Sequence, residues 1–196
     1  MTQLQPTIHT RRDAVENRER ILQAARELYA QAGVGVTLHD VVRHAGFGVG
    51  TAYRNFLNKE EVIDIVFEAK LQSLVDIGGE CLQGHDPWAG LTRFLEESLQ
   101  MQAADRGFSQ VLNEAGYGSE KLASARGQVG ELIVSMVDRL NQSALLRPGI
   151  VGTDVQLLHT ALAGLIDRSR PLSQTTYRKY LTIVLDGLYS RPPAPS

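Results

Sequence analysis

Apolar residues recur at intervals of three and four along most of the chain, a spacing that predicts amphipathic helices. The first stripe predicts a helix over about residues 14–32, which Gly33 ends. Two short helical segments follow, joined by a turn at Gly46. Alternation of the strand type does not extend over a convincing length, and the sequence has no internal repeat. The pattern therefore predicts an all-α fold.

A long helix is predicted after Asn58, whose side chain can cap it, and extends to about residue 77, where Gly78 and Gly79 interrupt the stripe. Turn residues then separate five further helical segments, near residues 88–102, 109–115, 120–146, 153–167 and 173–189. Polar, proline-containing sequence at both ends predicts disorder. We expect four parts: a disordered arm over 1–14, a helix-turn-helix head over 15–59, a helical body over 60–190 and a disordered tail over 191–196.

The segment from Thr37 to Phe56 is the most informative part of the head. The Thr37 hydroxyl can cap the first short helix, and Asp40 stands in its favourable first turn. Gly46 follows where that helix must stop, because glycine adopts a left-handed conformation without a Cβ clash. The second helix is too short to be stable alone and must be held by its neighbours. A short, propped helix with small and hydrogen-bonding residues at its start suits the major groove of DNA.

The candidate DNA contacts on this second helix are Val49, Gly50, Thr51, Tyr53, Arg54 and Asn55. Gly50 lets the backbone approach the groove closely. Thr51 and Tyr53 can donate hydrogen bonds to phosphate, although the Thr51 methyl can instead meet a thymine methyl. Arg54 can read guanine or anchor on phosphate, and both interpretations stay open. Asn55 can read adenine or simply end the helix, whereas Val49 offers only apolar contact.

The head resembles the TetR family of bacterial transcriptional repressors over about residues 16–69. The resemblance rests on the threonine at 37, Ala45-Gly46, Gly50-Thr51-Ala52-Tyr53, Phe56, Lys59-Glu60-Glu61, and the first-helix run from Arg20 to Gly33. It implies a DNA contact at His39 and phosphate contacts at Thr37 and Lys59. The chain departs from the family at Gly48, where serine or threonine is common, which leaves only backbone N–H groups there.

The resemblance also implies how the body works. The last two helices would pair with a second copy as a four-helix bundle, through Leu158, Leu162, Leu165, Ile166, Tyr177, Leu181, Val184 and Leu188. A small-molecule site would lie between the head and these helices. Its apolar candidates are Phe67, Leu71, Trp88, Leu91, Phe94, Leu95, Met101, Phe108, Leu112, Tyr117 and Met136, and its polar candidates are Asn113, Glu114 and His159. Simple core packing is the alternative for each of these residues.

The expected function is that of a homodimeric regulator that binds double-stranded DNA at a partly palindromic operator. Repression is the family's commonest behaviour, and a small-molecule effector of unknown identity would release the protein from DNA. The alternative is a DNA-binding protein that has no effector or is controlled by a partner protein.

Charge and composition fit this expectation. Among the 196 residues, positions 1–59 hold 8 Lys and Arg against 5 Asp and Glu, whereas the remainder holds 12 against 17. A mildly basic head on an acidic body suits a protein that touches DNA at one end. The single cysteine, Cys81, cannot form an intrachain disulfide and is expected to be a buried apolar group.

An enzyme is not expected. His159 and Asp167 are eight residues apart on one predicted helix, too far along its axis to act as a catalytic pair. The sequence offers no serine elbow, phosphate-binding glycine loop or metal-ligand spacing, so we expect no metal and no cofactor. Without a signal peptide or a run of about 18 apolar residues, the protein is expected in the cytoplasm with no membrane partner.

Overall fold

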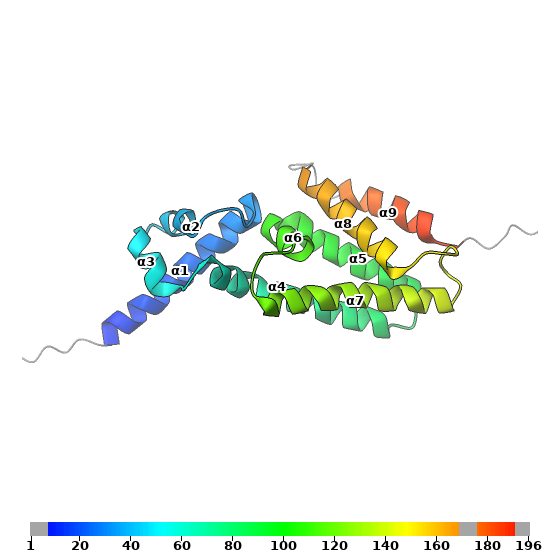
Figure 1. Cartoon of the computed structure of the whole chain (residues 1–196), viewed down its shortest axis with the longest axis horizontal. Coiled ribbons are helices and arrows are strands. Elements are labelled where there is room, and N and C mark those ends of the chain that lie inside the picture. The colour runs from blue at the N-terminus through cyan, green and yellow to red at the C-terminus, as the bar shows by residue number, and fades with distance from the viewer. Residues whose placement is uncertain (1–7, 169–175, 191–196) are drawn as a thin grey trace, which may run out of the picture.

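Three helices form the head in this computed structural model, which describes residues 8–168 and 176–190. Helix α1 spans Ile8–Ala32, α2 spans Leu38–His44 and α3 spans Val49–Asn55. Helix α1 begins earlier than the stripe predicted, so that residues 8–14, assigned to the arm from sequence, are helical. The three helices lie together at one end of the elongated molecule (Figure 1).

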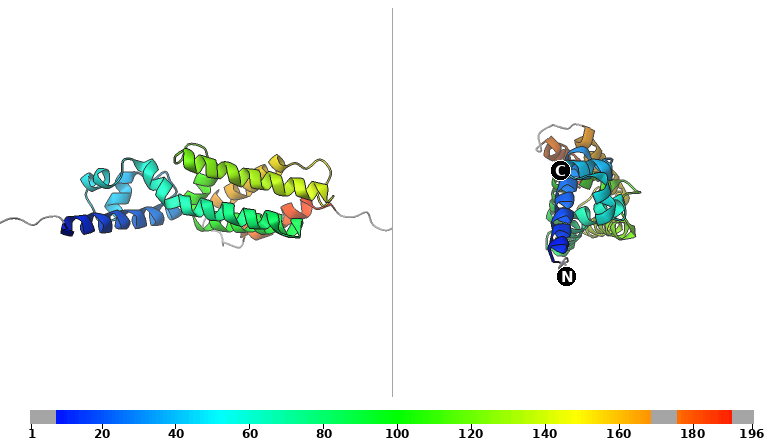
Figure 2. Two further views of the ribbon diagram at one scale, coloured as in Figure 1. Left: turned by 90° about the horizontal axis from the view of Figure 1, so that it is seen from below. Right: turned by 90° about the vertical axis from the view of Figure 1, so that its left-hand side faces the viewer.

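The body follows as six helices in the described residues. They are α4 (Lys59–Gln83), α5 (Pro87–Ala104), α6 (Arg106–Asn113), α7 (Glu120–Gln142), α8 (Gly152–Arg168) and α9 (Thr176–Leu188). Helix α4 runs from the head into the body and packs against α7 and α5, while α8 and α9 cover the other side of α5 (Figures 1 and 2). The all-α prediction is confirmed, because the described residues contain only one isolated β-bridge, between Leu146 and Tyr189.

Helix α4 continues through the two glycines that the sequence suggested would end it. A Cβ atom at Gly78 would lie 2.6 Å from Leu132 Cδ1 and 2.9 Å from Phe94 Cε2. The missing side chain therefore lets α7 and α5 approach α4 closely. Gly78 therefore marks a helix crossing rather than a helix end, whereas a Cβ atom at Gly79 would meet nothing within 4 Å.

Side-chain caps fix several of the helix starts. The Asn58 carboxamide oxygen accepts a hydrogen bond from the Glu61 N–H at 2.8 Å, which confirms the predicted cap of α4. Asp86 caps α5 through the N–H of Trp88 at 2.9 Å, and Asp105 caps α6 through the N–H of Phe108 at 3.0 Å. Within the part of the chain described, none of the helices is both long and apolar enough to cross a bilayer.

Candidate functional site

A reciprocal capping box opens α2. The Thr37 hydroxyl oxygen accepts from the Asp40 N–H at 3.1 Å, and the Asp40 carboxylate accepts from the Thr37 N–H at 3.3 Å. The Thr37 hydroxyl also donates to the Asp40 carboxylate at 2.5 Å, and this bond, followed by the one from the Thr37 N–H, holds the pKa of Asp40 below its ordinary value. The cap predicted at Thr37 is confirmed. Because both donors of Thr37 point at Asp40, a phosphate contact at Thr37 would compete with the box.

The turn between α2 and α3 has the predicted left-handed glycine. Gly46 has φ +81°, and the N–H of Phe47 returns to the carbonyl of Val42 at 3.0 Å. Phe47 precedes α3 and is partly buried against the core. Phe56 directly follows α3 and is buried. Helix α3 is therefore anchored by an aromatic residue before it and another after it.

Helix α3 presents an open surface at its start. A Cβ atom at Gly48 would meet nothing within 4 Å, and one at Gly50 would meet only the end of the Arg54 side chain at 3.9 Å. The chain's own packing therefore does not require glycine at either position, which agrees with close approach by another molecule. The side chains of Val49 and Tyr53 lie outside what the structure describes.

Two other candidate contacts on α3 bond to their own helix. Arg54 is exposed and its Nε donates to the Gly50 carbonyl at 3.0 Å. The Asn55 carboxamide donates to the Thr51 carbonyl at 2.7 Å. Arg54 thus lies along the exposed side of α3, and its remaining guanidinium donors can reach outward. His39 is also exposed, on α2.

The start of α4 adjoins α3. Lys59, its first residue, is half-buried, and burial lowers the pKa of its ammonium group. The carboxylate of Glu61 accepts from the Leu57 N–H at 2.7 Å and pairs with Arg18 of α1 at 2.9 Å. The Leu57 bond, followed by the Arg18 contact, lowers the pKa of Glu61. A network of polar contacts therefore surrounds the α3–α4 junction.

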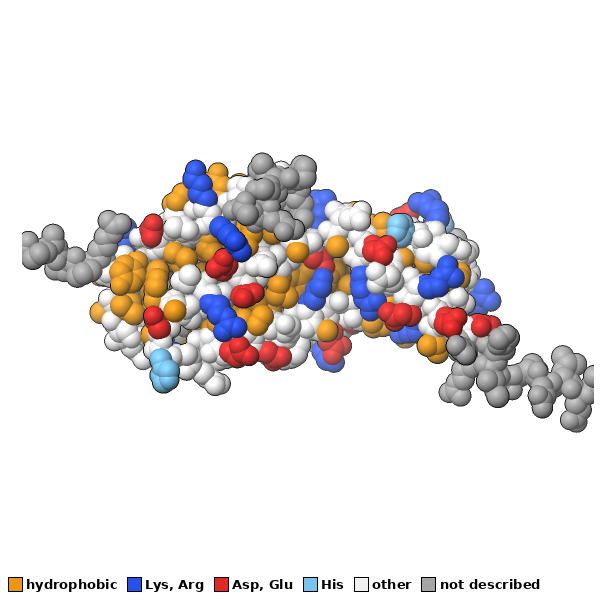
Figure 3. Space-filling view, turned by 180° about the vertical axis from the view of Figure 1, so that it is seen from behind, with side chains coloured by type: hydrophobic (Ala, Val, Ile, Leu, Met, Phe, Trp, Pro, Cys, Tyr) orange, Lys and Arg blue, Asp and Glu red, His pale blue; other side chains and the backbone are white. Residues whose placement is uncertain are grey.

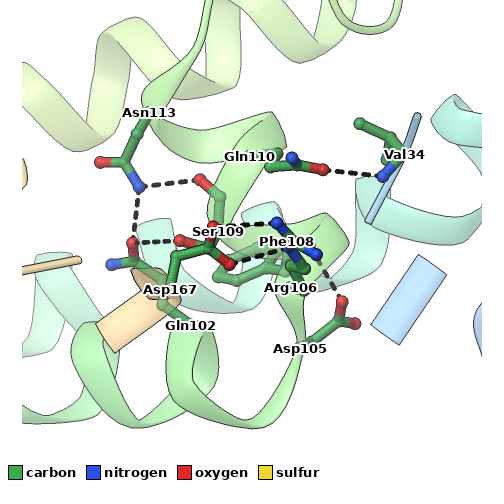
Figure 4. Close-up of polar contacts among 9 residues, drawn as sticks. All are labelled: Val34, Gln102, Asp105, Arg106, Phe108, Ser109, Gln110, Asn113 and Asp167. Carbon is green, nitrogen blue, oxygen red and sulfur yellow. Dashed lines mark hydrogen bonds and ion pairs between the residues drawn. The ribbon is translucent and has the colours of Figure 1, made fainter. Parts of the chain in front are cut away.

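Helix α6 joins the head to the body. The Gln110 carboxamide oxygen accepts from the N–H of Val34, just after α1, at 2.8 Å (Figure 4). Gly33 has φ +83°, and a Cβ atom there would lie 2.3 Å from that same oxygen. A Cβ atom at Gly107 would lie 2.8 Å from Phe67 and 3.0 Å from Tyr29. These glycines allow α6 to contact α1 and α4 directly.

Tyr29 is fully buried at this junction. Its ring stacks on Phe67 with centroids 6.0 Å apart, and Phe67 lies 6.5 Å from Phe108. The Tyr29 hydroxyl has no hydrogen-bond partner among the described residues. Burial raises the pKa of this hydroxyl to about 12. A buried hydroxyl without a partner costs stability, because the unfolded chain hydrates it.

We therefore expect Tyr29→Phe to stabilise the protein. The substitution keeps the ring and removes the unpaired hydroxyl, so the free energy of unfolding should rise by about 1 kcal/mol. Urea unfolding followed by circular dichroism measures this change. Tyr177→Phe, at a second buried tyrosine outside the junction, is the comparison variant. Lower stability of Tyr29→Phe would mean that the hydroxyl has a partner in solution.

Ion pairs tie α6 to two further helices. Lys70 of α4 pairs with Asp105, the residue that caps α6. Arg106 Nε lies 2.9 Å from Asp167 Oδ1 on α8, and its Nη2 donates to Asp167 Oδ2 at 3.2 Å (Figure 4). Together with Gln110, these contacts connect α6 to the head, to α4 and to the end of α8.

A buried polar cluster occupies the space between α5, α6 and α8. At its centre is the fully buried Gln102, whose carboxamide oxygen accepts from Asn113 at 2.6 Å and from the Ser109 hydroxyl at 3.3 Å. Its amide nitrogen lies 3.2 Å from the Ser98 hydroxyl and 3.3 Å from His159 Nε2. Since Gln102 presents a donor, His159 Nε2 must accept, which requires neutral imidazole. Burial also lowers the pKa of His159 to about 4.

Sequence reasoning found Asn113 and His159 but missed the central glutamine and both serines. The sequence nevertheless contained a signal for two of these buried polar residues. Ser98 and Gln102 occupy core positions of the α5 stripe that also contains Leu91, Leu95 and Leu99. Polar residues at such positions indicate a buried hydrogen-bond network.

The apolar residues proposed to line the effector site do not share one surface. Those that are completely or almost completely buried are Phe67, Leu71, Leu91, Phe94, Leu95, Phe108 and Met136. Those partly buried against the core are Trp88, Met101, Leu112 and Tyr117. Trp88 lies at the opposite end of α5 from Gln102. Its ring meets that of Tyr189 edge-on, with the ring centroids 4.8 Å apart. The structure thus places most of these side chains in ordinary core packing and brings Asn113 and His159 together through Gln102.

A groove of about 390 Å³ lies beside the polar cluster, between α6 and α8. Its α6 side comprises Ser109, Gln110, Asn113 and Glu114, and its α8 side comprises Thr160, Ala161, Ala163, Gly164, Asp167 and Arg168. Ser109 and Asn113 belong to both the groove and the cluster, so a molecule in the groove can contact the buried network. The exposed Glu114 lies at its rim.

Two family models cover most of the chain. Residues 21–65 match the family described as "Bacterial regulatory proteins, tetR family", and residues 86–190 match "Transcriptional regulator SbtR-like, C-terminal domain". The chain belongs to the TetR family. Its family and the matched relatives are transcriptional regulators, and the helix-turn-helix predicted from sequence lies within the residues that match the N-terminal family model.

Individual relatives of this TetR-family protein agree with the family assignment. The HTH-type transcriptional regulator SAB2452 of Staphylococcus aureus is 33% identical over 66 residues, which cover 33% of this chain and 36% of that relative. The match thus spans about a third of the relative's length. The TetR regulator SCO0520 of Streptomyces coelicolor is 26% identical, with a TM-score of 0.58 over 90% of this chain and 99% of that structure.

Two further solved structures share the fold at lower identity. The TetR-family regulator PfmR of Thermus thermophilus is 23% identical, with a TM-score of 0.69 over 89% of this chain and 98% of its own. SmeT, the repressor of the SmeDEF multidrug efflux pump of Stenotrophomonas maltophilia, is 20% identical, with a TM-score of 0.62 over 91% of this chain and 97% of its own.

The last two helices of this TetR protein have an inner and an outer face. Of the proposed dimer residues, Leu162, Tyr177, Leu181 and Leu188 are buried in the protomer itself. Leu165, Ile166 and Val184 are half-buried, and Leu158 is exposed. The apolar stripe therefore identified chiefly the inner face. The outer face exposes further apolar side chains that are not among the proposed dimer residues: Leu157, Tyr180 and Ile183.

Proposed function

We propose that this TetR-family protein is a homodimeric repressor that binds a partly palindromic operator and is released by a small-molecule effector. Residues 15–59 form the DNA-binding unit in this proposal, and residues 60–190 form the regulatory and dimerisation unit. A regulator of a bacterial family acts on DNA in the cytoplasm. The observation that carries the proposal is an anchored α3 whose start is open at Gly50 and at Gly48 just before it.

Dimerisation is supported by the outer face of α8 and α9. Leu157 is 70% exposed and Ile183 is 56% exposed, which is unusual for large apolar side chains on adjacent helices. A Cβ atom at Gly164 or Gly187 would meet nothing within 4 Å, so the protomer itself does not require glycine there. Apolar areas are broader over the body than over the head on the face in Figure 3. A two-fold dimer would present two α3 helices about 34–36 Å apart, one turn of duplex DNA.

Effector control is supported by the contacts of α6. A molecule that enters the α6–α8 groove would reach Asn113 and Ser109 on one side and Asp167 on the other. Because Gln110 of the same helix holds Val34 of the head, displacement of α6 would move the head. The ligand can shift this equilibrium only by its differential affinity for the two arrangements.

Arg54→Ala is expected to weaken operator binding by about 1–3 kcal/mol. If Arg54 reads guanine, the preference at one base position is lost and binding to unrelated DNA changes little. If it anchors on phosphate, affinity falls alike on all sequences. Titration of operator variants by fluorescence anisotropy separates the two roles, and unchanged affinity on every duplex would remove Arg54 from the interface.

Thr51→Ala is expected to lower affinity by roughly 0.5–1.5 kcal/mol, the usual net contribution of one hydrogen bond. Thr51→Ser is the matched variant, since it keeps the hydroxyl and removes the methyl group. Recovery of affinity in Thr51→Ser indicates a phosphate contact, whereas continued loss indicates methyl contact with thymine. Wild-type affinity in both variants would exclude a contact at this residue.

Selection of bound duplexes from a random pool tests the proposal as a whole. The expected product is a partly palindromic site, and repetition with added cell metabolites should reduce its recovery. A site that no metabolite affects would favour the alternative of a regulator without an effector or controlled by a partner protein. Failure to enrich any sequence would contradict the proposed function.

A further inference from the structure

Arg18 of α1 contacts both ends of the α3–α4 junction. One guanidinium nitrogen, Nη1, donates to the carbonyl of Asn55, the last residue of α3. The other, Nη2, donates to Glu61 Oε1 of α4 at 2.9 Å. The guanidinium also lies over the Phe56 ring, 4.4 Å from its centroid. A single side chain thus touches α3, the connecting residue and α4.

Arg20 makes the corresponding contacts on the side where the chain enters α3. Its Nη2 donates at 3.1 Å to the carbonyl of Ala45, which caps the end of α2. Its guanidinium lies 4.5 Å from the centroid of the Phe47 ring. Both arginines therefore combine an aromatic stack with a hydrogen bond to the carbonyl at a helix end.

These contacts address a weakness of the recognition helix. Helix α3 has only seven residues, too few to be stable alone, so neighbouring elements must set its orientation. Hydrogen bonds from a charged donor are stronger than neutral ones, and stacking on an aromatic ring adds to them. The planar guanidinium makes both kinds of contact at once, which the ammonium group of lysine cannot do in the same way.

We propose that Arg18 and Arg20 are positioning residues for DNA recognition. Arg18 holds the end of α3 against α1, Arg20 holds the turn that leads into α3, and neither contacts DNA itself. Through Glu61, Arg18 also joins the end of α3 to the first turn of α4, so that the two helices move as one unit. The proposal rests on the proposed function, because its readout is binding to a specific duplex.

Glu61→Gln tests the proposal through the sign of its effect. The substitution removes a negative charge from the DNA-binding head, so electrostatics alone would tighten binding to any duplex. Loss of the Arg18 pair should instead weaken binding to the selected duplex by about threefold to fivefold. Glu19→Gln is the matched control, because Glu19 pairs with Arg26 within α1 at 2.8 Å and that pair does not involve α3.

Arg18→Ala is the stronger variant, since it removes all three contacts. Affinity for the selected duplex should fall at least about tenfold, while affinity for unrelated DNA should change only as in Arg26→Ala. The salt dependence of specific binding should match that of Arg26→Ala, whereas loss of a direct phosphate contact would reduce its slope by about 0.9. Arg18→Lys should recover little of the specific affinity, because it cannot form the fork.

The experiment is anisotropy titration of the selected and unrelated duplexes at several salt concentrations, with circular dichroism to verify folding. Glu61→Gln remains informative if Arg18→Ala does not fold. Weaker specific binding by Glu61→Gln, with equal or tighter binding by Glu19→Gln, is the expected result. Equal behaviour of the two glutamine variants would overturn the positioning role while leaving the proposed function intact. If the wild-type protein selects no duplex, the proposed function itself fails.

Discussion

Ile183→Glu is expected to disrupt the proposed dimer and leave a monomer. Ile183 lies on the outer face of α9 and is 56% exposed in the protomer. In a two-fold interface that includes this face, the Ile183 side chains of both subunits would be buried. Each unpaired buried carboxylate costs several kcal/mol, so the dimer dissociation constant should rise by at least about 1000-fold.

Sedimentation equilibrium at micromolar concentration measures this change. Val15→Glu places the same charge on an exposed apolar position of α1, far along the chain from α8 and α9, and should leave the dimer intact. Operator affinity of Ile183→Glu should fall with the dimer, because a monomer occupies only one half-site. An undiminished dimer in this variant would show that α9 does not form the interface.

Acidification is expected to destabilise the protein through His159. The pKa of this residue is lowered by burial from 6.5 to about 4 in the folded protein. Between these values the unfolded chain binds a proton that the folded chain does not, so the free energy of unfolding falls as the pH falls. The complete loss attributable to His159 is about 3 kcal/mol, and it levels off only below pH 4.

His159→Gln isolates this contribution. Glutamine cannot be protonated in this range, and its carboxamide oxygen can accept from Gln102 as His159 Nε2 does. Urea unfolding from pH 7 to pH 4 should therefore show a shallower loss in His159→Gln than in the wild type. His85→Gln removes an exposed histidine and should follow the wild-type curve. Identical curves for all three proteins would mean that His159 is protonated in the folded protein to the same extent as in the unfolded chain, so that folding does not shift its pKa.

Local features of the fold were predictable from sequence because they depend on neighbouring residues. The caps at Thr37 and Asn58 and the left-handed Gly46 each follow from a few consecutive positions. The glycine at 78 was misinterpreted for the same reason. Its role depends on Leu132 and the close approach of α7, and no local rule shows that contact.

The polar contacts of the candidate site were harder to predict because they join distant parts of the chain. Arg18 and Glu61 are 43 positions apart, and Gln102 and His159 are 57 apart. A hydrophobic stripe shows which side of a helix is apolar but not what covers it. For that reason the stripes of α8 and α9 identified residues of the protomer core, whereas the exposed Leu157 was missed.

The most direct test of sequence-specific DNA binding by α3 compares two duplexes. One is the site enriched from a random pool, and the other has the same bases in shuffled order. At near-physiological salt, the wild-type protein should bind the enriched site at least about 1000-fold more tightly, and Arg54→Ala should bind it more weakly than the wild type. Equal wild-type affinity for both duplexes would contradict the assignment of α3 as a sequence-reading helix.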